Sequence, residues 1–141
     1  LPPAPPPGGL YVPTVRDGKY LYVSGHVPFD TDGVRIKHLC STEADVPAAK
    51  AAAAHNALAI LATLRAELGS LNKVHRIVKS LGMVNCVQPF AHHPQVINGY
   101  SEVMREVFGP VNGVGARSAV GMVLPNGVAT EVETLFELKD E

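Results

Sequence analysis

The stretch that decides the fold runs from Gly115 to Leu138 and reads GARSAVGMVLPNGVATEVETLFEL. Apolar and β-branched residues lie on both sides of a Pro-Asn-Gly turn centred on Asn126. This pattern predicts two strands joined as a β-hairpin. Arg117 lies in the first of them among apolar neighbours, although an arginine is almost never buried without a partner. The environment of Arg117 is therefore the first question that the sequence raises.

Side chains of a strand alternate between the two faces of a sheet. In the second strand, Val132 and Phe136 share one face and Glu131 and Glu133 the other. Because the larger apolar residues should face the helices, we expect Arg117, Glu131 and Glu133 on the face that no helix covers. One interpretation of that face is a solvated surface, on which ion pairs contribute little. The other is a subunit interface, because the apolar residues Ala119, Val123 and Leu135 are expected there as well.

The predicted hairpin sets a distance between Arg117 and Glu131. With the turn at residues 125–127, Glu131 lies opposite residues 121–122. That is about four residues from Arg117, or about 13 Å at roughly 3.3 Å per residue. One small ligand cannot contact both side chains over that distance. If the two cooperate, we expect the carboxylate to come from a neighbouring subunit.

Two helices and a further strand are predicted outside this stretch. Residues 45–69 carry an apolar stripe at helical spacing, with Asp45 as the N-cap and Gly69 at the end. Residues 92–109 carry a second such stripe. Residues 72–87 alternate and are β-branched, which is typical of a strand.

The N-terminal part completes the expected fold. A turn signal at residues 17–18 predicts a hairpin, and residues 34–39 are typical of a short third strand. The first ten residues are rich in proline and predict an extended arm. The order ββ(β)–α–β–α–ββ predicts one α+β domain over residues 1–141, with both helices on one face of a mixed sheet.

The composition narrows the classes of function. Of 141 residues, 46% are hydrophobic and 18% charged, close to the average of globular proteins. Lysine and arginine total 12 and aspartate and glutamate 13, a net charge of −1. We therefore expect no surface for nucleic acid or anionic membrane. No apolar run is long enough to span a bilayer. We expect no signal peptide and, by default, a cytoplasmic protein.

The cysteines and histidines form no recognisable motif. Cys40 and Cys86 make no CxxC pair, so we expect two reduced thiols and no disulfide. The six histidines show neither HExxH nor a paired cysteine spacing, so no metal site is expected. A Cys/His nucleophile is not expected either, because the sequence lacks a local signature for one.

Several segments between Tyr11 and Leu138 match the motifs of a known family, and they occur in the same order as in that family. They are YVPTV (11–15), YVSGHVPF (22–29), VINGYSEVMREVF (96–108), ARSAV (116–120), LPNGV (124–128) and EVE (131–133). They resemble the reactive intermediate deaminase A (RidA) family, also called YjgF or L-PSP. The resemblance implies a ferredoxin-like or chorismate-mutase-like sheet with two helices on one face. It also implies a homotrimer with a central barrel and ligand clefts between subunits.

The resemblance also implies an activity. Active members hydrolyse reactive 2-imino and enamine acids to 2-keto acids and ammonia, with no metal or organic cofactor. By position, Arg117 matches the arginine that binds the substrate carboxylate, a task suited to a planar guanidinium. Glu131 matches the glutamate that orients and activates water, and near an arginine it should stay ionised. The other matched residues line the cleft: Tyr11, Ser24, Gly25 and Asn98.

This chain departs from the family pattern at two cleft positions. His26, which adjoins the cleft and is a further candidate for binding the substrate, stands where relatives usually have glutamine. Ala119 stands where some have cysteine. These departures indicate a divergent branch and leave three functions open. The first is hydrolysis of 2-imino acids, and the second is non-catalytic binding of small carboxylates. The third is the endoribonuclease or translation-inhibitor role of some family members, which the lack of a basic surface disfavours.

Overall fold

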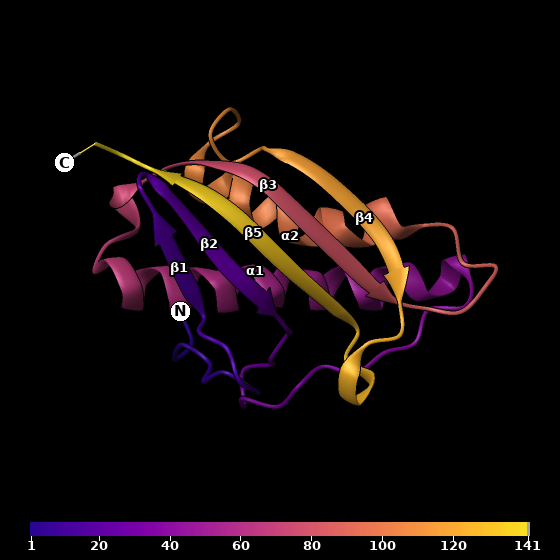
Figure 1. The fold of residues 1–141 in the computed structure, drawn as a ribbon. Helices are drawn as coiled ribbons and strands as arrows, with labels where there is room; N and C mark the ends of the chain where they lie inside the picture. Colours follow the sequence, from indigo (N-terminus) through magenta and orange to yellow (C-terminus); the bar gives the residue numbers. More distant parts are fainter. Residues whose placement is uncertain (141) are drawn as a thin grey trace.

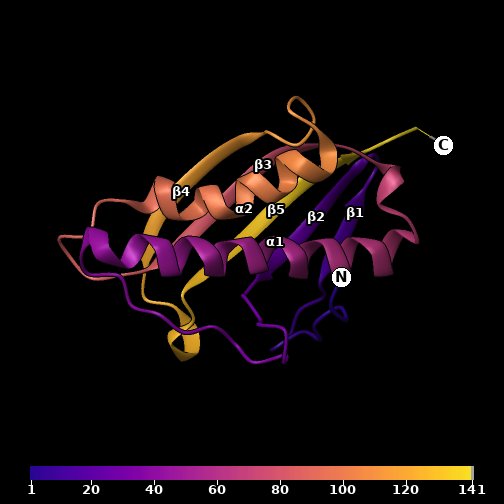
Figure 2. The same cartoon turned by 180° about the vertical axis from the view of Figure 1, so that it is seen from behind.

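Five strands form one mixed sheet in the order β1-β2-β5-β3-β4. The computed structural model describes residues 1–140. Its elements are β1 (Thr14–Asp17), β2 (Tyr20–His26), α1 (Val46–Leu68), β3 (Val74–Asn85), α2 (His93–Phe108), β4 (Ala116–Met122) and β5 (Thr130–Leu138). Short 3-10 turns lie at Glu43–Asp45, Leu71–Lys73 and Pro125–Gly127. Both helices cover one face of the sheet and leave the other open (Figure 1, Figure 2). The predicted α+β class is confirmed.

The strands β4 and β5 do not pair, so the predicted C-terminal hairpin is wrong. β3 lies between them, parallel to β4 and antiparallel to β5. α2 connects β3 to β4, and such a crossover places its two strands side by side and parallel. The turn signal is real, since Asn126 and Gly127 both adopt positive φ. That turn lies in the connection from β4 to β5, which passes the end of β3, so the two strands that it joins are not neighbours in the sheet (Figure 1).

Both predicted helices are confirmed. α1 ends at Gly69, which has a φ of 82° and donates its N–H to the carbonyl of Arg65. Asp45 occupies the predicted N-cap position, but its side chain makes no capping hydrogen bond. Its carboxylate instead accepts hydrogen bonds from the N–H groups of Ser41 and Thr42, at 2.8 and 3.0 Å. Asp45 therefore stabilises the turn before the helix.

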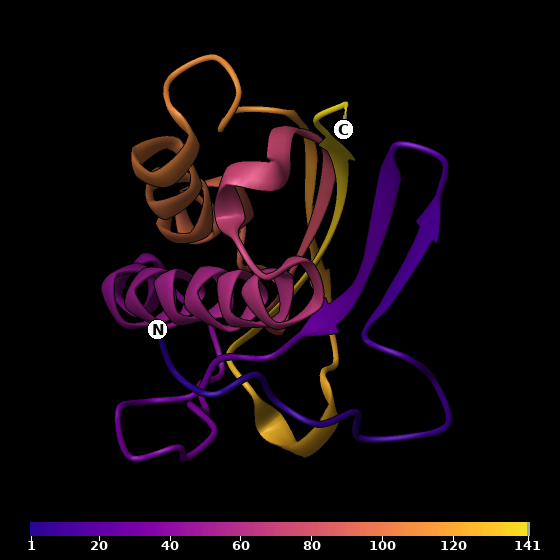
Figure 3. The same cartoon turned by 90° about the vertical axis from the view of Figure 1, so that its left-hand side faces the viewer.

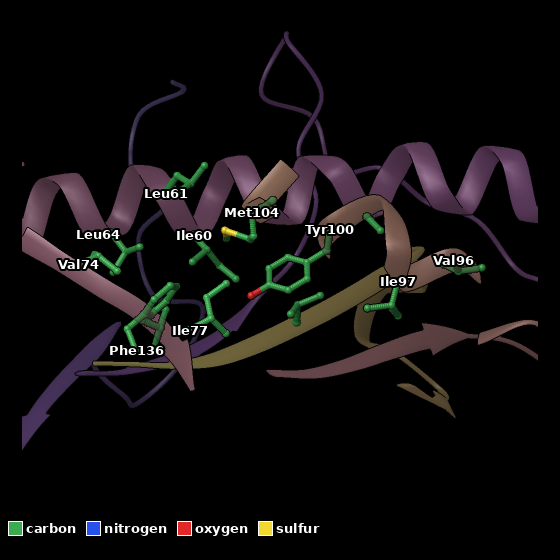
Figure 4. Packing of buried hydrophobic residues seen from close by; sticks show 14 of the residues in the cluster. Ile60, Leu61, Leu64, Val74, Ile77, Val96, Ile97, Tyr100, Met104 and Phe136 are labelled. Carbon is green, nitrogen blue, oxygen red and sulfur yellow. The ribbon is translucent and has the colours of Figure 1, made fainter. Parts of the chain in front are cut away.

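The core lies between the helices and the sheet (Figure 4). The apolar stripes of both helices are buried there against β3 and β5, and each large side chain contributes roughly 1.5–3 kcal/mol on burial. A polar contact lies inside this layer. The hydroxyl of Tyr100 is 2.9 Å from Ser80 Oγ and 2.6 Å from Thr134 Oγ1. These contacts fix α2 against β3 and β5.

The helices lie on one side of the sheet only (Figure 3), and the open face carries exposed apolar side chains. Tyr20 and Tyr22 on β2 lie there, and so do Val120 and Met122 on β4. The partly apolar character expected for this face is confirmed. Ala119, which we expected on the same face, packs against the core instead.

The connection from β2 to α1 contains no strand, so the third strand predicted at residues 34–39 is wrong. The connection makes only isolated bridges, which join Phe29 to Arg35, Lys37 to Val128 and Cys40 to Cys86. Its backbone is thereby held against the link between β4 and β5. Within residues 1–140, no helix has both the length and the apolar character needed to cross a membrane.

Candidate functional site

Arg117 and Glu131 lie on opposite faces of the sheet, so the prediction of a shared face is wrong. Directly paired strand residues share a face. Ser80 of β3 pairs with Arg117 on β4 and with Thr134 on β5, and it is buried beneath α2. Met83 pairs with Val120 and with Glu131 on the open face. Arg117 therefore points to the helix side and Glu131 to the open side.

The guanidinium of Arg117 is held by α2. Its Nη1 donates to Asn98 Oδ1 at 2.9 Å and to Ser101 Oγ at 3.0 Å, and its Nη2 donates to the Pro94 carbonyl at 3.3 Å. None of these partners is charged. Within residues 1–140, no carboxylate forms an ion pair with Arg117. Its positive charge therefore remains available to an anion.

A hollow of about 300 Å³ lies beside this guanidinium. We call it the Arg117 pocket, and it is lined by Ile77, Ser80, Asn98, Tyr100, Ser101, Glu102, Arg105, Gly113, Val114, Gly115 and Arg117. The predicted residues Arg117 and Asn98 meet here through a hydrogen bond. Because β4 is an edge strand, the pocket lies at the rim of the sheet.

A second hollow, of about 470 Å³, contains Glu131. We call it the Glu131 pocket, and its lining includes Pro5, Pro6, Pro7, Gly8, Tyr11, Ser24, Gly25, His26, Arg35 and Glu133. The predicted residues Tyr11, Ser24, Gly25, His26 and Glu131 therefore lie together. The two pockets share no lining residue. One chain thus holds the predicted site as two separate parts.

The carboxyl of Glu131 has a raised pKa. The first cause is burial, and the second is the negative charge of Glu133 two residues along the same strand. The expectation that Arg117 keeps Glu131 ionised is therefore wrong within one chain, because the arginine is on the other face. A raised pKa brings a carboxyl closer to neutral pH, where it can both take and return a proton.

Gly25 provides the space for this carboxyl. A Cβ at Gly25 would overlap Oε2 of Glu131. The pairing of β2 with β5 is irregular between Val23 and His26, so the backbone at Gly25 departs from the regular ladder. A residue with a side chain at this position would displace the Glu131 carboxylate.

The N-terminal arm is fastened over β2 and forms one wall of the Glu131 pocket. Ser24 Oγ donates to the carbonyl of Val12 at 2.7 Å, and the Ser24 N–H donates to the carbonyl of Pro13 at 2.9 Å. The hydroxyl of Tyr11 accepts a hydrogen bond from the N–H of Gly8 at 3.0 Å. Ser24 and Tyr11 therefore position the arm as well as lining the pocket.

The ring of His26 points to α1. Its Nδ1 is 2.6 Å from the Ser24 carbonyl, so Nδ1 donates, and its Nε2 is 2.7 Å from Thr63 Oγ1 and accepts from that hydroxyl. Burial lowers the pKa of His26, so the imidazole is neutral. Asn56 donates to the His26 carbonyl at 2.7 Å. Both ring nitrogens are thus occupied, and His26 holds the backbone of the pocket in place.

The sequence analysis missed a pairing of Cys86 with His93. Cys86 Sγ lies 3.4 Å from His93 Nε2. A signal was present, since Cys86 lies near the end of the strand predicted at 72–87 and His93 near the start of the helix predicted at 92–109. In residues 1–140 there is no group of three or more His, Cys, Asp or Glu side chains that could hold a metal ion.

Comparison with known proteins gives a consistent result. The family model described as "Endoribonuclease L-PSP" matches residues 2–137. Protein TCP17 of Trypanosoma cruzi is 38% identical over 141 residues, which is 99% of this chain and 88% of that protein. The crystal structure of Atu1372 from Agrobacterium tumefaciens, a protein of unknown function, is 37% identical with a TM-score of 0.86 and covers 94% of this chain and 86% of its own.

A solved structure called RidA is also similar. RidA from the Antarctic bacterium Psychrobacter sp. PAMC 21119 is 27% identical, with a TM-score of 0.65, and covers 95% of this chain and 93% of its own. The matches span both the Arg117 pocket and the Glu131 pocket. The chain therefore belongs to the L-PSP family, also called YjgF or RidA, as its sequence motifs indicated.

Proposed function

We propose that this protein hydrolyses 2-imino and enamine acids to 2-keto acids and ammonia, at a site formed between two copies of the chain. One copy supplies Arg117 with Asn98, and the next supplies Glu131 with Tyr11, Ser24 and Gly25. The observation that carries the proposal is the division of charge in one chain. Within residues 1–140, Arg117 on one face forms no ion pair with a carboxylate, and Glu131 on the other face forms no ion pair with a cation.

The geometry of one chain argues against an internal site. One strand, β3, separates the strands of Arg117 and Glu131, which corresponds to about 10 Å across the sheet at roughly 4.8 Å per strand. On β3, Ser80 pairs with Arg117 and Met83 pairs with Glu131. These two positions are three residues apart, which adds about 10 Å of separation along the strand direction. The sheet itself lies between the two side chains. A substrate of three or four carbons cannot reach both within one copy.

Contact between two different surfaces also limits the type of assembly. The Arg117 pocket of one copy would meet the Glu131 pocket of the next, which is a head-to-tail contact. Such contacts close into a ring when the rotation allows it. We propose a homotrimer, with the exposed apolar side chains of β2 and β4 buried around the central axis. The family resemblance supports this number of subunits.

The proposed reaction needs positioning and one group that handles protons. Arg117 donates two parallel N–H bonds to the carboxylate of the imino acid and so orients the C=N carbon. Glu131 takes a proton from water as its oxygen attacks that carbon. Glu131 passes this proton to the nitrogen, which gives the carbinolamine. Glu131 then takes the proton of the carbinolamine hydroxyl and returns it to the nitrogen, so the C–N bond breaks as the C=O bond forms and the nitrogen leaves as ammonia. The raised pKa of Glu131 suits both steps.

The experiment is a coupled assay. An amino-acid oxidase generates 2-iminopropanoate or 2-iminobutanoate, and semicarbazide trapping measures how fast the imine disappears. The proposal expects faster disappearance with the wild-type protein than without it. Unchanged decay with several amino-acid precursors, together with binding of a 2-keto acid, would favour the non-catalytic carboxylate binder. Absence of both would leave the endoribonuclease role, tested by cleavage of single-stranded RNA.

A further inference from the structure

Cys86 and His93 form a pair of reactive groups outside both pockets described above. Cys86 follows the last residue of β3, and His93 is the first residue of α2. Sγ and Nε2 are 3.4 Å apart. The pair opens into a cleft of about 460 Å³ lined by Cys86, Val87, Gln88, Phe90, His93, Gly121, Met122 and Val123. None of these residues lines the Arg117 pocket or the Glu131 pocket.

The arrangement is that of a nucleophile with its base. A thiol within hydrogen-bond reach of an imidazole can transfer its proton as it attacks an electrophile. The ring of His93 is steadied by the edge of Phe90, with ring centroids 5.3 Å apart and an interplanar angle of 81°. Cys86 is only partly buried, so small molecules in the cleft can reach its sulfur.

Gly121 keeps this pair uncovered. A Cβ at Gly121 would lie 2.6 Å from Cys86 Sγ and 2.9 Å from His93 Nε2. Any side chain at this position would press on both reactive atoms. The glycine therefore leaves the sulfur open on the side of β4.

The second cysteine lies directly beside the pair. Cys40 and Cys86 are bridge partners on neighbouring parallel segments. Paired residues extend to the same face, and adjacent strands are about 4.8 Å apart, within the range of Cα separations found in disulfides. Cys40 is fully buried. Burial raises its pKa to about 11, and the nearby Asp45 and Cys86 add to this effect. Cys40 is thus shielded from solvent but adjacent to Cys86.

We propose that Cys86, with His93 as its base, is a thiol site that reduces small hydroperoxides, and that Cys40 closes the oxidised state as a disulfide. This inference does not depend on imine hydrolysis. In the first step, the Cys86 thiol gives its proton to His93 and its sulfur attacks one peroxide oxygen. The S–O bond forms and the O–O bond breaks, and the departing oxygen takes the proton from His93 and leaves as an alcohol or water.

The second step consumes the sulfenic acid formed in the first. The sulfur of Cys40 attacks the sulfur of Cys86, the S–S bond forms and the S–O bond breaks. The proton of Cys40 leaves with the oxygen as water. Across both steps, two thiols lose two electrons and the hydroperoxide gains them. The peroxide is the oxidant, and no other reactant is needed.

The test treats the full-length protein with hydrogen peroxide and follows it by intact mass and peptide mapping. Wild type should lose two hydrogens and give one peptide pair that joins Cys40 to Cys86. Cys40→Ser should stop at a sulfenic acid on Cys86 that dimedone traps. His93→Gln should slow the loss of the Cys86 thiol by about tenfold, since an unassisted cysteine is only a few per cent thiolate near pH 7.

Two further variants serve as controls for the proposed roles of Cys86 and His93. Cys86→Ser should leave Cys40 unmodified, because Cys40 is buried. Gly121→Ala, which crowds the pair without removing it, should slow the reaction even if His93→Gln fails to fold. Equal rates for wild type, His93→Gln and Gly121→Ala would overturn the role of the pair. Over-oxidation of wild-type Cys86 to a sulfinic acid, with Cys40 still a free thiol, would overturn the disulfide step.

Discussion

The Arg117 pocket and the Glu131 pocket differ in charge, in construction and in the face of the sheet that they occupy. The first combines an edge strand with one helix, and α2 supplies all three acceptors for the guanidinium. The second combines an irregular part of β2, the central strand β5 and the N-terminal arm. Within the described residues 1–140, Arg117 pairs with no carboxylate and Glu131 pairs with no cation. The difference indicates that neither pocket is a complete site alone.

The largest effect is expected for Glu131→Gln. Glutamine keeps the shape of the side chain but cannot take a proton from water, so imine turnover should fall by about 10²–10⁴-fold. Binding of a 2-keto acid should persist, because the carboxylate contact belongs to Arg117. Glu106→Gln is the control, since it makes the same change at an exposed residue of α2 that lines neither pocket. Equal losses in both variants would remove Glu131 from its proposed role.

The next effect concerns the other pocket. Arg117→Lys should weaken keto-acid binding nearly as much as Arg117→Ala, by roughly 1.5–3 kcal/mol or about 10–150-fold, because lysine cannot offer two parallel N–H donors. Titration calorimetry measures this directly. Arg105→Lys, in the same pocket, should change little. A fully competent lysine at position 117 would contradict bidentate binding.

A smaller effect separates the two causes of the raised Glu131 pKa. Glu131 must be ionised to act as a base, so kcat/KM should fall as the pH drops through its raised pKa. Glu133→Gln removes one negative charge that raises this pKa, so the acidic limb of the profile should move to lower pH. The exposed Glu102 on α2 pairs with Lys50 and serves as the control, because Glu102→Gln should leave the limb in place. An unmoved limb in Glu133→Gln would show that this charge does not reach Glu131.

The smallest effect tests the wall of the Glu131 pocket. Ser24→Ala removes the 2.7 Å hydrogen bond to the Val12 carbonyl and should lower the free energy of unfolding by about 0.5–1.5 kcal/mol. Urea denaturation measures the loss. Since this bond also fastens the arm, KM for the imino acid should rise while keto-acid contacts to Arg117 stay unchanged. A variant with wild-type stability and KM would mean that the arm does not depend on Ser24.

Sequence patterns predicted the elements well and their pairing poorly. The helix at residues 45–69 and the strand at 72–87 could be predicted from local periodicity. One face of each element is buried, so apolar residues recur at the spacing of that element. The pairing of β4 depends on the α2 crossover, and the turn at Asn126 reports only local backbone conformation. A tight turn does not require that the strands on either side of it be neighbours.

The error in the face of Arg117 has a physical cause. On β4 the larger apolar residues, Val120 and Met122, face away from the helices, because small residues are needed where α2 packs closely. On the neighbouring strand β3, a Cβ at Gly82, the partner of Ala119, would lie 2.6 Å from the side chain of Ile97. The rule that large apolar residues face the helices therefore failed for this edge strand, although it held for β5. The structure places the matched residues in two groups, Arg117 with Asn98 in one pocket and Glu131 with Tyr11, Ser24 and Gly25 in the other.

The central claim, that each site needs two copies of the chain, is tested most directly by mixing two inactive variants. Arg117→Ala and Glu131→Gln subunits are refolded or expressed together in equal amounts, and imine hydrolysis is measured. In a head-to-tail ring, about one quarter of the sites would combine an intact Arg117 with an intact Glu131, so about one quarter of wild-type activity should return. No recovery from well-mixed oligomers, with both parents inactive, would contradict the account.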